Sequence, residues 1–372
     1  MKVLHINSYY AASGSPGFYK NFYEAQLRIG LDITVFVPVP YNLDPAKKKQ
    51  YGEYSQVMKT HNPMDRFIFH VKHAKILKEA RRRFSGEKFD VIHAHSLFSN
   101  GYVAWKLSKQ LGIPYVVAVR NTDVNTFFRY MPHLRGTARK ILRDAGRVLF
   151  INEPYREFVI EEHVPADQKK EISDKTLVIP NGIDKFWHAN KNQNKQKRTD
   201  RGLKLLTVGQ INRNKNNFTV AKAAEILINR GFDVTYTVVG EQKDKKIFRA
   251  LQKYPFVKCV PPKPKEELIN YYRAADVFVL PSITETFGLV YPEAMTQGLP
   301  VIYSKGQGFD EQFEEGTVGY HVNSKNEEEI ADRIMDIMGN YETISRNCIQ
   351  LSDKFDWAKI AGEYRRIYKD CR

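Results

Sequence analysis

The chain has 372 residues, of which 42% are hydrophobic and 27% are charged. This is the composition of a soluble globular protein with room for two domains. No apolar run approaches the roughly 20 residues of a membrane-spanning helix, and the first seven residues resemble a β-strand instead of a signal peptide. Three cysteines, Cys259, Cys348 and Cys371, have neither disulfide nor metal spacing, which fits a reducing compartment. We therefore expect a cytoplasmic protein.

The net charge is +16 and the isoelectric point is near 9.5. A charge of this size suggests an anionic partner, which could be a nucleic acid, an anionic membrane surface or a phosphorylated substrate. The sequence contains no recognised nucleic-acid-binding motif, so we expect no nucleic-acid partner. A basic nucleic-acid-binding protein remains a rival interpretation, and its affinity would fall steeply with salt concentration.

Apolar, strand-like runs alternate with helix-like segments along the whole chain. In the first half these runs cover residues 3–8, 33–38, 91–95, 115–120, 148–152 and 177–180. In the second half they cover residues 203–210, 234–239, 257–260, 277–280, 301–304 and 319–322. Continuous Val, Ile and Leu runs between helices predict parallel sheets covered on both faces. Because the pattern occurs twice, we predict an α/β protein with two doubly wound, Rossmann-like domains.

The domain junction falls where the sequence loses its apolar periodicity. Residues 190–200 are polar and highly charged, which predicts a loop or linker. We place the first domain at residues 1–183 plus 355–372 and the second at residues 184–354. Open parallel sheets bind ligands at the carboxyl ends of their strands, so two such domains facing each other would create a cleft.

Two segments of the first domain have features of binding surfaces. The loop after the first strand contains Gly14 and Gly17, where the backbone could come close to a ligand. Residues 65–84 predict a helix with an apolar face, which includes Phe67, Ile68 and Val71, and a basic face. Such a helix could contact a membrane from one side, or it could pack on the core and expose its lysines. Both interpretations stay open.

The most informative segment is residues 281–294, PSITETFGLVYPEA. It follows an apolar strand and places Glu285 on the outgoing loop and Glu293 about one turn into the next helix. Between them, the N–H groups of Gly288, Leu289 and Val290 should lack backbone partners, as they do at a helix N-terminus that binds anions. The carboxylates could accept hydrogen bonds from sugar hydroxyls, and the neighbouring backbone N–H groups could bind a phosphate. This combination suits a sugar nucleotide.

This segment resembles the E-x7-E motif of retaining GT-B glycosyltransferases, in particular family 4, and the similarity continues to Ile302. The resemblance implies a GT-B fold, with a C-terminal helix that crosses back to the first domain. It implies a nucleotide-diphosphate sugar of the UDP or GDP type as the substrate and no cofactor. It also implies catalysis without a metal, and the sequence has neither an Asp-x-Asp motif nor a His/Cys cluster at metal spacing.

Further site residues follow from the resemblance. The family has a Gly-Arg-x-x-x-x-Lys pattern that contacts the donor diphosphate, and here Gly209 and Lys215 match it, whereas Gln210 stands in place of the arginine. We expect Arg213 to replace that arginine, so that Glu285, Lys215 and Arg213 are catalytic. The remaining predicted donor contacts are Glu293, Gly288, Leu289, Val290, Phe287, Gly209, Gly14 and Gly17, together with Val260 and Pro262 at the nucleobase.

On the acceptor side, the family pattern places a histidine and an aspartate after a first-domain strand. Asp123 matches the aspartate, but Arg120 stands where the histidine would be. We expect Arg120, Asn121 and Asp123 to lie on the acceptor side, where Arg120 would suit an anionic ligand. His93 and His95 alternate on a strand, and for each a core position is the favoured interpretation.

The function that we predict is retaining, metal-independent transfer of a sugar to a hydroxyl acceptor, a glycan or a lipid-linked glycan, in surface polysaccharide or glycolipid synthesis. Two enzymatic rivals remain. A sugar-nucleotide epimerase of the same architecture would convert its substrate without an acceptor. An inverting transferase would need a base near the first loop, but residues 8–17 contain no Asp, Glu or His.

Overall fold

The computed structural model describes residues 1–11, 16–43, 52–196 and 202–371. The chain divides into two compact units, which we call the N-terminal unit (Met1–Pro180 and Trp357–Arg372) and the C-terminal unit (Asn181–Asp356). The predicted boundaries, after residues 183 and 354, lie close to these divisions. None of the helices in the described ranges is long and apolar enough to cross a membrane.

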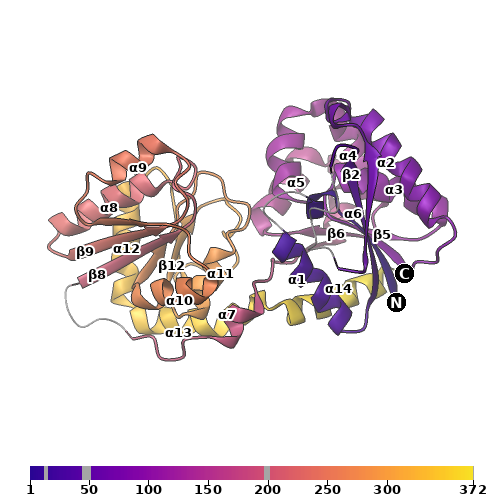
Figure 1. The fold of residues 1–372 in the computed structure, drawn as a ribbon. Helices are drawn as coiled ribbons and strands as arrows, with labels where there is room; N and C mark the ends of the chain where they lie inside the picture. The colour runs from indigo at the N-terminus through magenta and orange to yellow at the C-terminus, as the bar shows by residue number, and fades with distance from the viewer. Residues whose placement is uncertain (12–15, 44–51, 197–201, 372) are drawn as a thin grey trace. The chain divides into compact units, whose positions relative to one another are not determined.

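The N-terminal unit is built on a parallel sheet (Figure 1). Its strand order is β3-β2-β1-β4-β5-β6-β7. Its strands are β1 (Lys2–Ile6), β2 (Asp32–Pro40), β3 (Ser55–His61), β4 (Val91–Ala94), β5 (Tyr115–Ala118), β6 (Arg147–Phe150) and β7 (Thr176–Val178). Its helices are α1 (Pro16–Arg28), α2 (Phe69–Phe84), α3 (Ser99–Leu111), α4 (Arg135–Asp144), α5 (Glu153–His163), α6 (Lys169–Ser173) and α14 (Trp357–Asp370). Shorter helical turns are η1 (Ser8–Ala11), η3 (Pro63–Phe67), the π-helical η4 (Asp123–Phe128), η5 (Pro132–Leu134) and η6 (Ala166–Gln168).

The strand β3 is missing from the sequence prediction. Its residues, SQVMKTH, are mostly polar, and only Thr60 and His61 are buried. As the edge strand of the sheet it pairs with β2 alone, so it needs no continuous apolar run. An edge strand of this kind carries little of the signal on which sequence prediction depends.

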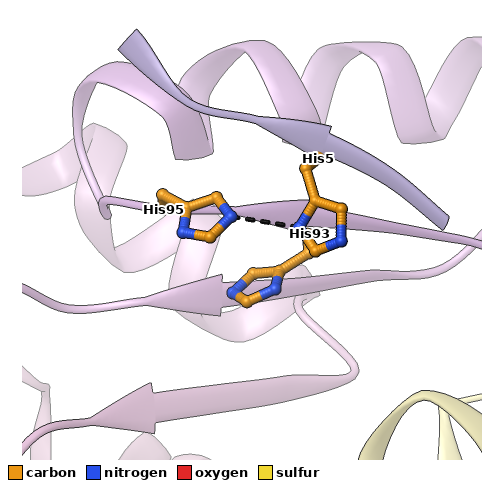
Figure 2. Close-up of side chains that lie close together, drawn as sticks. All are labelled: His5, His93 and His95. Carbon is orange, nitrogen blue, oxygen red and sulfur yellow. Dashed lines mark hydrogen bonds between the residues drawn. The ribbon is translucent and has the colours of Figure 1, made fainter. Parts of the chain in front are cut away.

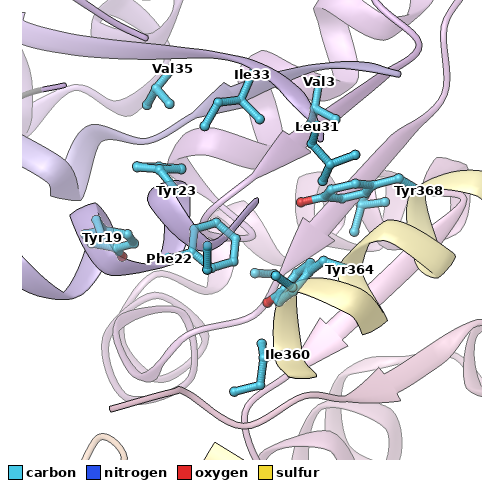
Figure 3. Close-up of a cluster of buried hydrophobic side chains, with 14 of the residues drawn as sticks. Val3, Tyr19, Phe22, Tyr23, Leu31, Ile33, Val35, Ile360, Tyr364 and Tyr368 are labelled. Carbon is cyan, nitrogen blue, oxygen red and sulfur yellow. The ribbon is translucent and has the colours of Figure 1, made fainter. Parts of the chain in front are cut away.

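Helices α1 and α14, which are far apart in sequence, share one hydrophobic core against the sheet (Figure 3). The sheet contributes residues such as Val3 and Val35, and α1 contributes Phe22 and Tyr23. Helix α14 adds a stripe of buried side chains at helical spacing: Trp357, Ile360, Ala361, Tyr364, Ile367 and Tyr368. Helix α14, which follows the C-terminal unit in the sequence, therefore completes the core of the N-terminal unit.

The predicted helix at residues 65–84 is divided in the structure. The turn η3 ends at Phe67, Ile68 has an extended backbone, and α2 begins at Phe69. The later part of α2 buries His73, Ile76, Leu77, Ala80 and Phe84, as expected for a core helix. At the other end, Phe67, Ile68 and Val71 remain exposed. The interpretation as a core helix thus describes the later part of α2. The exposed apolar residues that a membrane contact would need are confined to the start of the segment.

The C-terminal unit has a second parallel sheet, with the strand order β10-β9-β8-β11-β12-β13. Its strands are β8 (Gly202–Val208), β9 (Asp233–Val239), β10 (Val257–Val260), β11 (Val277–Val279), β12 (Val301–Ser304) and β13 (Gly319–Val322). Its helices are α7 (Lys185–Ala189), α8 (Asn217–Asn229), α9 (Lys245–Leu251), α10 (Lys265–Ala274), α11 (Val290–Thr296), α12 (Glu327–Gly339), α13 (Tyr341–Leu351) and the turn η7 (Ser352–Phe355). Because all strands are parallel, the loops after β8, β10 and β11 leave the sheet at the same edge.

Candidate functional site

The loops after the two central strands of the C-terminal unit meet in an ion pair. The Nζ atom of Lys215, on the loop between β8 and α8, donates a hydrogen bond to Oε2 of Glu285 at 2.6 Å. Ser282 Oγ donates to the same oxygen at 3.1 Å. Glu285 is only 8% exposed. A nearly buried carboxylate held by a lysine and a hydroxyl is a preorganised polar group at the carboxyl edge of the sheet.

Three asparagines fix the loop that carries Lys215. Asn212 Oδ1 accepts the backbone N–H of Lys215 at 2.9 Å. Asn214 pairs with Thr284 in both directions, accepting its N–H at 3.0 Å and donating Nδ2 to its carbonyl at 2.9 Å. Asn216 adopts the left-handed conformation, with φ of 58°, and donates to the carbonyl of Pro281 at 3.0 Å. The two loops therefore hold Lys215 and Glu285 in one rigid arrangement.

Two glycines let the backbone around Glu285 fold tightly. Gly288 has φ of +77°, and a Cβ atom there would lie 2.2 Å from the Tyr291 ring. A Cβ atom on Gly308 would lie 2.2 Å from the carbonyl oxygen of Thr286. Within the described part of the chain, the N–H groups of Gly288, Leu289 and Val290 have no backbone acceptor, as predicted from the motif. They add donors next to the Lys215–Glu285 pair.

Glu293 lies in the first turn of α11, where Oε2 accepts a hydrogen bond from the Tyr272 hydroxyl at 3.1 Å. Burial raises the pKa of Glu293 to about 8, and hydrogen bonds from Tyr272 and Trp187 oppose that rise. Its carboxyl group is therefore protonated at neutral pH. Because a ligand that donates hydrogen bonds to the carboxylate would ionise it, binding at this position would be coupled to the release of a proton.

The other predicted residues of this unit occupy different environments. Gly209, after β8, packs so closely on Gly240 that a Cβ atom on Gly240 would lie 1.7 Å from its carbonyl oxygen. Val260 is buried at the end of β10, where its carbonyl accepts from Gly240 N–H at 2.9 Å, and Pro262 is exposed just beyond. These three predicted residues share the carboxyl edge with Glu285.

Arg213 and Phe287 differ from the other predicted contacts in their surroundings. Arg213 is exposed on the loop and has no side-chain partner among the described residues. Phe287 is 2% exposed, and its ring packs against Phe309 and Phe355 at centroid distances of 6.3 and 5.9 Å. The Phe287 side chain therefore anchors the loop after β11 in the core. Arg213, on the loop after β8, presents a cation that is unpaired among the described side chains.

On the N-terminal unit, Asp123 has a structural position. It is fully buried, and its carboxylate accepts N–H hydrogen bonds from Leu97 at 2.9 Å, Phe98 at 3.0 Å and Arg120 at 2.9 Å. Burial raises the pKa of Asp123 to about 6, and the backbone hydrogen bonds oppose that rise. This carboxyl group joins the loops after β4 and β5, so we interpret it as a positioning residue for the predicted acceptor side.

Arg120 and Asn121 are the partly exposed residues of this region. Asn121 Nδ2 donates to the Tyr155 hydroxyl at 2.8 Å. Burial raises the pKa of Tyr364, and the Arg120 cation and its hydrogen bond oppose that rise. Helix α14 therefore helps to fix Arg120. Of the first predicted loop, Gly17 is exposed in α1, and Gly14 lies outside the described residues.

Sequence reasoning did not foresee a buried histidine cluster (Figure 2). His5 of β1 lies opposite His93 of β4, and His93 and His95 share a strand face, so the three rings meet with ligand atoms within 4.8 Å of one another. His5 Nδ1 and His95 Nε2 are 3.0 Å apart. The Tyr368 hydroxyl contacts His93 Nδ1 at 2.7 Å. His93 and His95 are core residues, as predicted.

The chemistry of this cluster fits a network of neutral side chains better than a metal site. Burial lowers the pKa of His5 to about 3, and it lowers the pKa values of His93 and His95 well below their usual range. Neutral imidazoles can bind metals, but no carboxylate is among these ligand atoms. The nearby Arg120 cation disfavours further positive charge. A dication would therefore be buried without a counter-charge, which is strongly unfavourable.

The only other such grouping among the described residues is Asp310, Glu315 and His321. His321 Nδ1 lies 2.9 Å from Asp310 and 3.3 Å from Glu315, so the carboxylates already pair with a side chain of their own group. Asp310 also accepts the N–H of Gly306 at 2.6 Å. We interpret this group as a hydrogen-bonded cluster that shapes the loop after β12.

Several supporting residues of the Glu285 site are also absent from the prediction. Gln307 Oε1 accepts the N–H of Glu285 at 3.0 Å, Ser282 contacts its carboxylate, and Tyr272 contacts Glu293. Ser282 lies in the motif itself, so its hydroxyl beside Glu285 was available as a signal. Gln307 and Tyr272 come from other elements, and nothing in their local sequence indicates these contacts.

Two family models together span most of the chain. Residues 16–185 match the model described as Glycosyltransferase Family 4, and residues 189–352 match Glycosyl transferases group 1. The two matches correspond to the two structural units. The residues around Glu285, Glu293 and Lys215 lie within the second match.

Curated relatives share about a quarter of their residues with this chain. A D-inositol 3-phosphate glycosyltransferase of Paenarthrobacter aurescens is 28% identical over 306 residues, which cover 76% of this chain and 73% of the relative. A putative teichuronic acid biosynthesis glycosyltransferase, TuaC, of Bacillus subtilis is 27% identical over 339 residues, which cover 84% of this chain and 83% of the relative.

Solved structures share the fold over nearly the whole length. Sucrose-phosphate synthase of Thermosynechococcus elongatus has a TM-score of 0.74 at 20% identity, with 99% of this chain and 98% of that chain covered. Anabaena HepE in complex with UDP has a TM-score of 0.72 at 19% identity, with 98% and 99% covered. With its paired Rossmann-like units and both family matches, the chain belongs to glycosyltransferase family 4 and is a glycosyltransferase of the GT-B fold.

Proposed function

We propose that the enzyme transfers a sugar from a nucleotide-diphosphate sugar to a hydroxyl acceptor with retention of anomeric configuration and without a metal. The observation that carries this proposal is the 2.6 Å contact between Lys215 and Glu285 beside three N–H groups that lack acceptors among the described residues. This arrangement offers positive charge and donors to a diphosphate, and a carboxylate to sugar hydroxyls.

In this mechanism the donor replaces contacts that the side chains make with one another. Lys215 moves from Glu285 to the diphosphate and stabilises the charge that grows as the sugar departs. Glu285 then accepts hydrogen bonds from hydroxyls of the donor sugar and orients it. Arg213, which is exposed on the loop that carries Lys215, adds a second cation. Glu293 accepts hydrogen bonds from the ribose hydroxyls.

Retention follows if the acceptor enters on the face from which the leaving group departs. The bond between the anomeric carbon and the diphosphate oxygen breaks, and the bond from that carbon to the acceptor oxygen forms on the same face. The acceptor proton moves to the departing phosphate oxygen, so no side chain has to act as a base. The products are the glycosylated acceptor and the nucleoside diphosphate.

The substrates that we propose are a UDP or GDP sugar and a glycan or lipid-linked acceptor of a surface polysaccharide or glycolipid. The UDP bound to the Anabaena structure supports the donor class. The teichuronic acid assignment of the Bacillus subtilis relative supports the acceptor class. We propose that the enzyme acts in the cytoplasm, at the inner face of the membrane.

A thermal-shift titration with UDP, GDP and ADP, with and without EDTA, tests the donor site. Stabilisation by one nucleotide, unchanged by EDTA and lost in Lys215→Ala, is the expected result. Absence of a shift with every nucleotide would contradict the proposal. Product analysis separates the rivals, because an epimerase converts the sugar nucleotide without an acceptor and an inverting enzyme yields the opposite anomer.

A further inference from the structure

A compact group of apolar side chains is exposed at the start of α2. Met64 is 71% exposed, Phe67 68%, Ile68 59% and Val71 41%. We call these four residues the apolar tip. They lie on η3, on the extended residue after it and on the first turn of α2. Single exposed apolar residues are common, but four within eight positions form a patch that indicates an interaction surface.

The segment that carries the apolar tip also carries basic side chains. The Arg66 guanidinium lies over the Phe67 ring, 4.7 Å from its centroid. The one acidic residue of η3, Asp65, is engaged by Lys75 Nζ at 2.8 Å, so its charge is neutralised within the patch. Further along α2, the exposed Lys78 extends the positive surface away from the tip.

A second segment with the same character lies beside the apolar tip. The Phe69 ring, in the first turn of α2, contacts the Phe127 ring of η4 at a centroid distance of 6.1 Å. Three residues after Phe127, Tyr130 is 66% exposed, and the Arg129 guanidinium lies 5.4 Å from its ring centroid. Two neighbouring segments thus each present an exposed aromatic ring beneath an arginine.

We propose that the apolar tip, together with Arg66, Arg129 and Tyr130, docks on the surface of an anionic lipid bilayer. Apolar side chains at the tip would enter the boundary between headgroups and acyl chains, and the arginines would pair with lipid phosphates. Aromatic rings with polar hydroxyls, such as Tyr130, favour this interface. The net charge of +16 adds a long-range attraction to the same surface.

Docking at this face has a consequence for the acceptor. This consequence rests on the proposed function. Residues 121–130 are helical, with η4 in the middle, and join Asn121, beside Arg120, to the docked Tyr130. At about 1.5 Å per residue, this segment spans on the order of 15 Å. The geometry suits an acceptor whose lipid remains in the bilayer while its hydroxyl reaches Arg120 and Asn121 above the headgroups.

Vesicle co-sedimentation of the full chain tests docking without any need for activity. The double variant Phe67→Ser/Ile68→Ser is compared with Leu27→Ser, which changes a 40% exposed apolar residue on α1. The vesicles contain phosphatidylcholine, alone or with phosphatidylglycerol, at low and high salt. We expect the wild type and Leu27→Ser to bind the anionic vesicles, and the double variant to bind at least tenfold more weakly with an unchanged melting temperature.

Two results would overturn the docking surface: no binding of the wild type to anionic vesicles, or equal binding by the double variant. The second result would indicate a diffuse charge effect. Nucleotide-induced stabilisation, measured on the same variants without vesicles, reports on the donor site alone. Vesicle binding without nucleotide binding would therefore reject the proposed function and leave docking intact, and the reverse result would reject docking only.

Discussion

Lys215 Nζ and Glu285 Oε2 lie 2.6 Å apart although the two residues are 70 positions apart in the sequence. Each is held by further polar contacts, Lys215 through the Asn212 side chain and Glu285 through Ser282 and Gln307. The ion pair therefore holds the Lys215 ammonium next to the position where we expect the diphosphate. Substrate binding would then exchange one anionic partner of Lys215 for another.

Replacing Lys215 by alanine should lower kcat/KM by roughly one to two decades, because a hydrogen bond to a charged group is worth about 1.5–3 kcal/mol. The melting temperature should also fall, since Glu285 loses a partner while it stays buried. Steady-state kinetics and thermal melts measure the two effects. Lys222→Ala, which breaks an exposed pair with Glu327 in the same unit, is the control and should change neither.

The variant Lys215→Ala/Glu285→Ala should regain part of the lost stability but none of the lost activity. Removal of both charges leaves no buried carboxylate without its cation, whereas both residues remain necessary for the donor. A double-mutant cycle in thermal melts and in kcat/KM measures this difference. Additive losses of stability would contradict a direct interaction between the two side chains.

The half-buried Glu293, with its raised pKa, should make nucleotide affinity depend on pH. With its pKa raised to about 8, the group is neutral at pH 6.5, and a ligand that prefers the carboxylate binds more tightly as pH rises towards 9. Isothermal titration with the preferred nucleoside diphosphate, in buffers of different ionisation enthalpy, should detect proton release. Glu293→Gln should bind more weakly at high pH and show no such dependence.

The same raised pKa predicts that Glu293→Gln, which should weaken nucleotide binding at high pH, increases the stability of the fold. The folded pKa of about 8 exceeds the ordinary glutamate value of 4.5, so the stability that Glu293 contributes is complete below pH 4.5 and is lost as pH rises to 8. The glutamine variant should therefore melt at a higher temperature than the wild type at pH 8, with a smaller difference at pH 5. Equal melting curves at both values would refute the raised pKa.

The histidine cluster should make the N-terminal unit sensitive to acid. His5, His93 and His95 have folded pKa values below 6.5, so their stabilising effect is present above pH 6.5 and is lost as pH falls below it. Three such groups give a slope of up to roughly 4 kcal/mol per pH unit. Asp123, with a raised pKa of about 6, offsets part of this slope between pH 6 and 4.

The measurement is the melting temperature as a function of pH between 7 and 4. His93→Gln removes one titrating group. The slope of stability against pH should therefore fall by the amount that corresponds to about one bound proton. His70→Gln, at an exposed position of α2, is the matched control and should leave the slope as it is in the wild type. A steep, unaltered slope in His93→Gln would assign the acid sensitivity to other groups.

A methyl group at Gly308 should disturb the site without a change in any charge. Its Cβ would meet the Thr286 carbonyl oxygen at 2.2 Å, and the Gly308 N–H donates to the Glu285 carbonyl at 3.2 Å. Gly308→Ala should therefore displace Glu285 and reduce both kcat/KM and nucleotide-induced stabilisation at least tenfold. Gly339→Ala, where an added Cβ meets nothing within 4 Å, should behave as the wild type.

The sequence could predict those features whose signal is local. Each apolar run found in the sequence corresponds to a strand, and the signal is strongest where the strand is buried along its whole length, as in β4, β5 and β12. The motif around Glu285 and Glu293 could be assigned because strand, Gly turn and helix start follow one another directly. The edge strand β3, with half-exposed polar residues, lacked such a signal.

Contacts between distant segments were beyond prediction from local patterns. Nothing near His5 in the sequence indicates that it meets His95, which lies 90 positions away, and only the pairing of β1 with β4 brings them together. Similarly, the motif match marks Asp123 as a site residue, yet its burial among three backbone N–H groups depends on the loop after β4. Residue type and spacing indicate that a group is present, whereas tertiary structure decides what it touches.

The packing of α14 against α1 and β1 has a consequence for biosynthesis. The aromatic side chains that close the core of the N-terminal unit, including Tyr364 and Tyr368, follow the whole C-terminal unit in the sequence, so the ribosome makes them after residues 181–356. Until then, Phe22 and the neighbouring rings of α1 lack their cover and are accessible to chaperones. A chain that ends before Trp357 would carry this exposed surface permanently, so quality control can recognise such a truncated chain by the state of its first half.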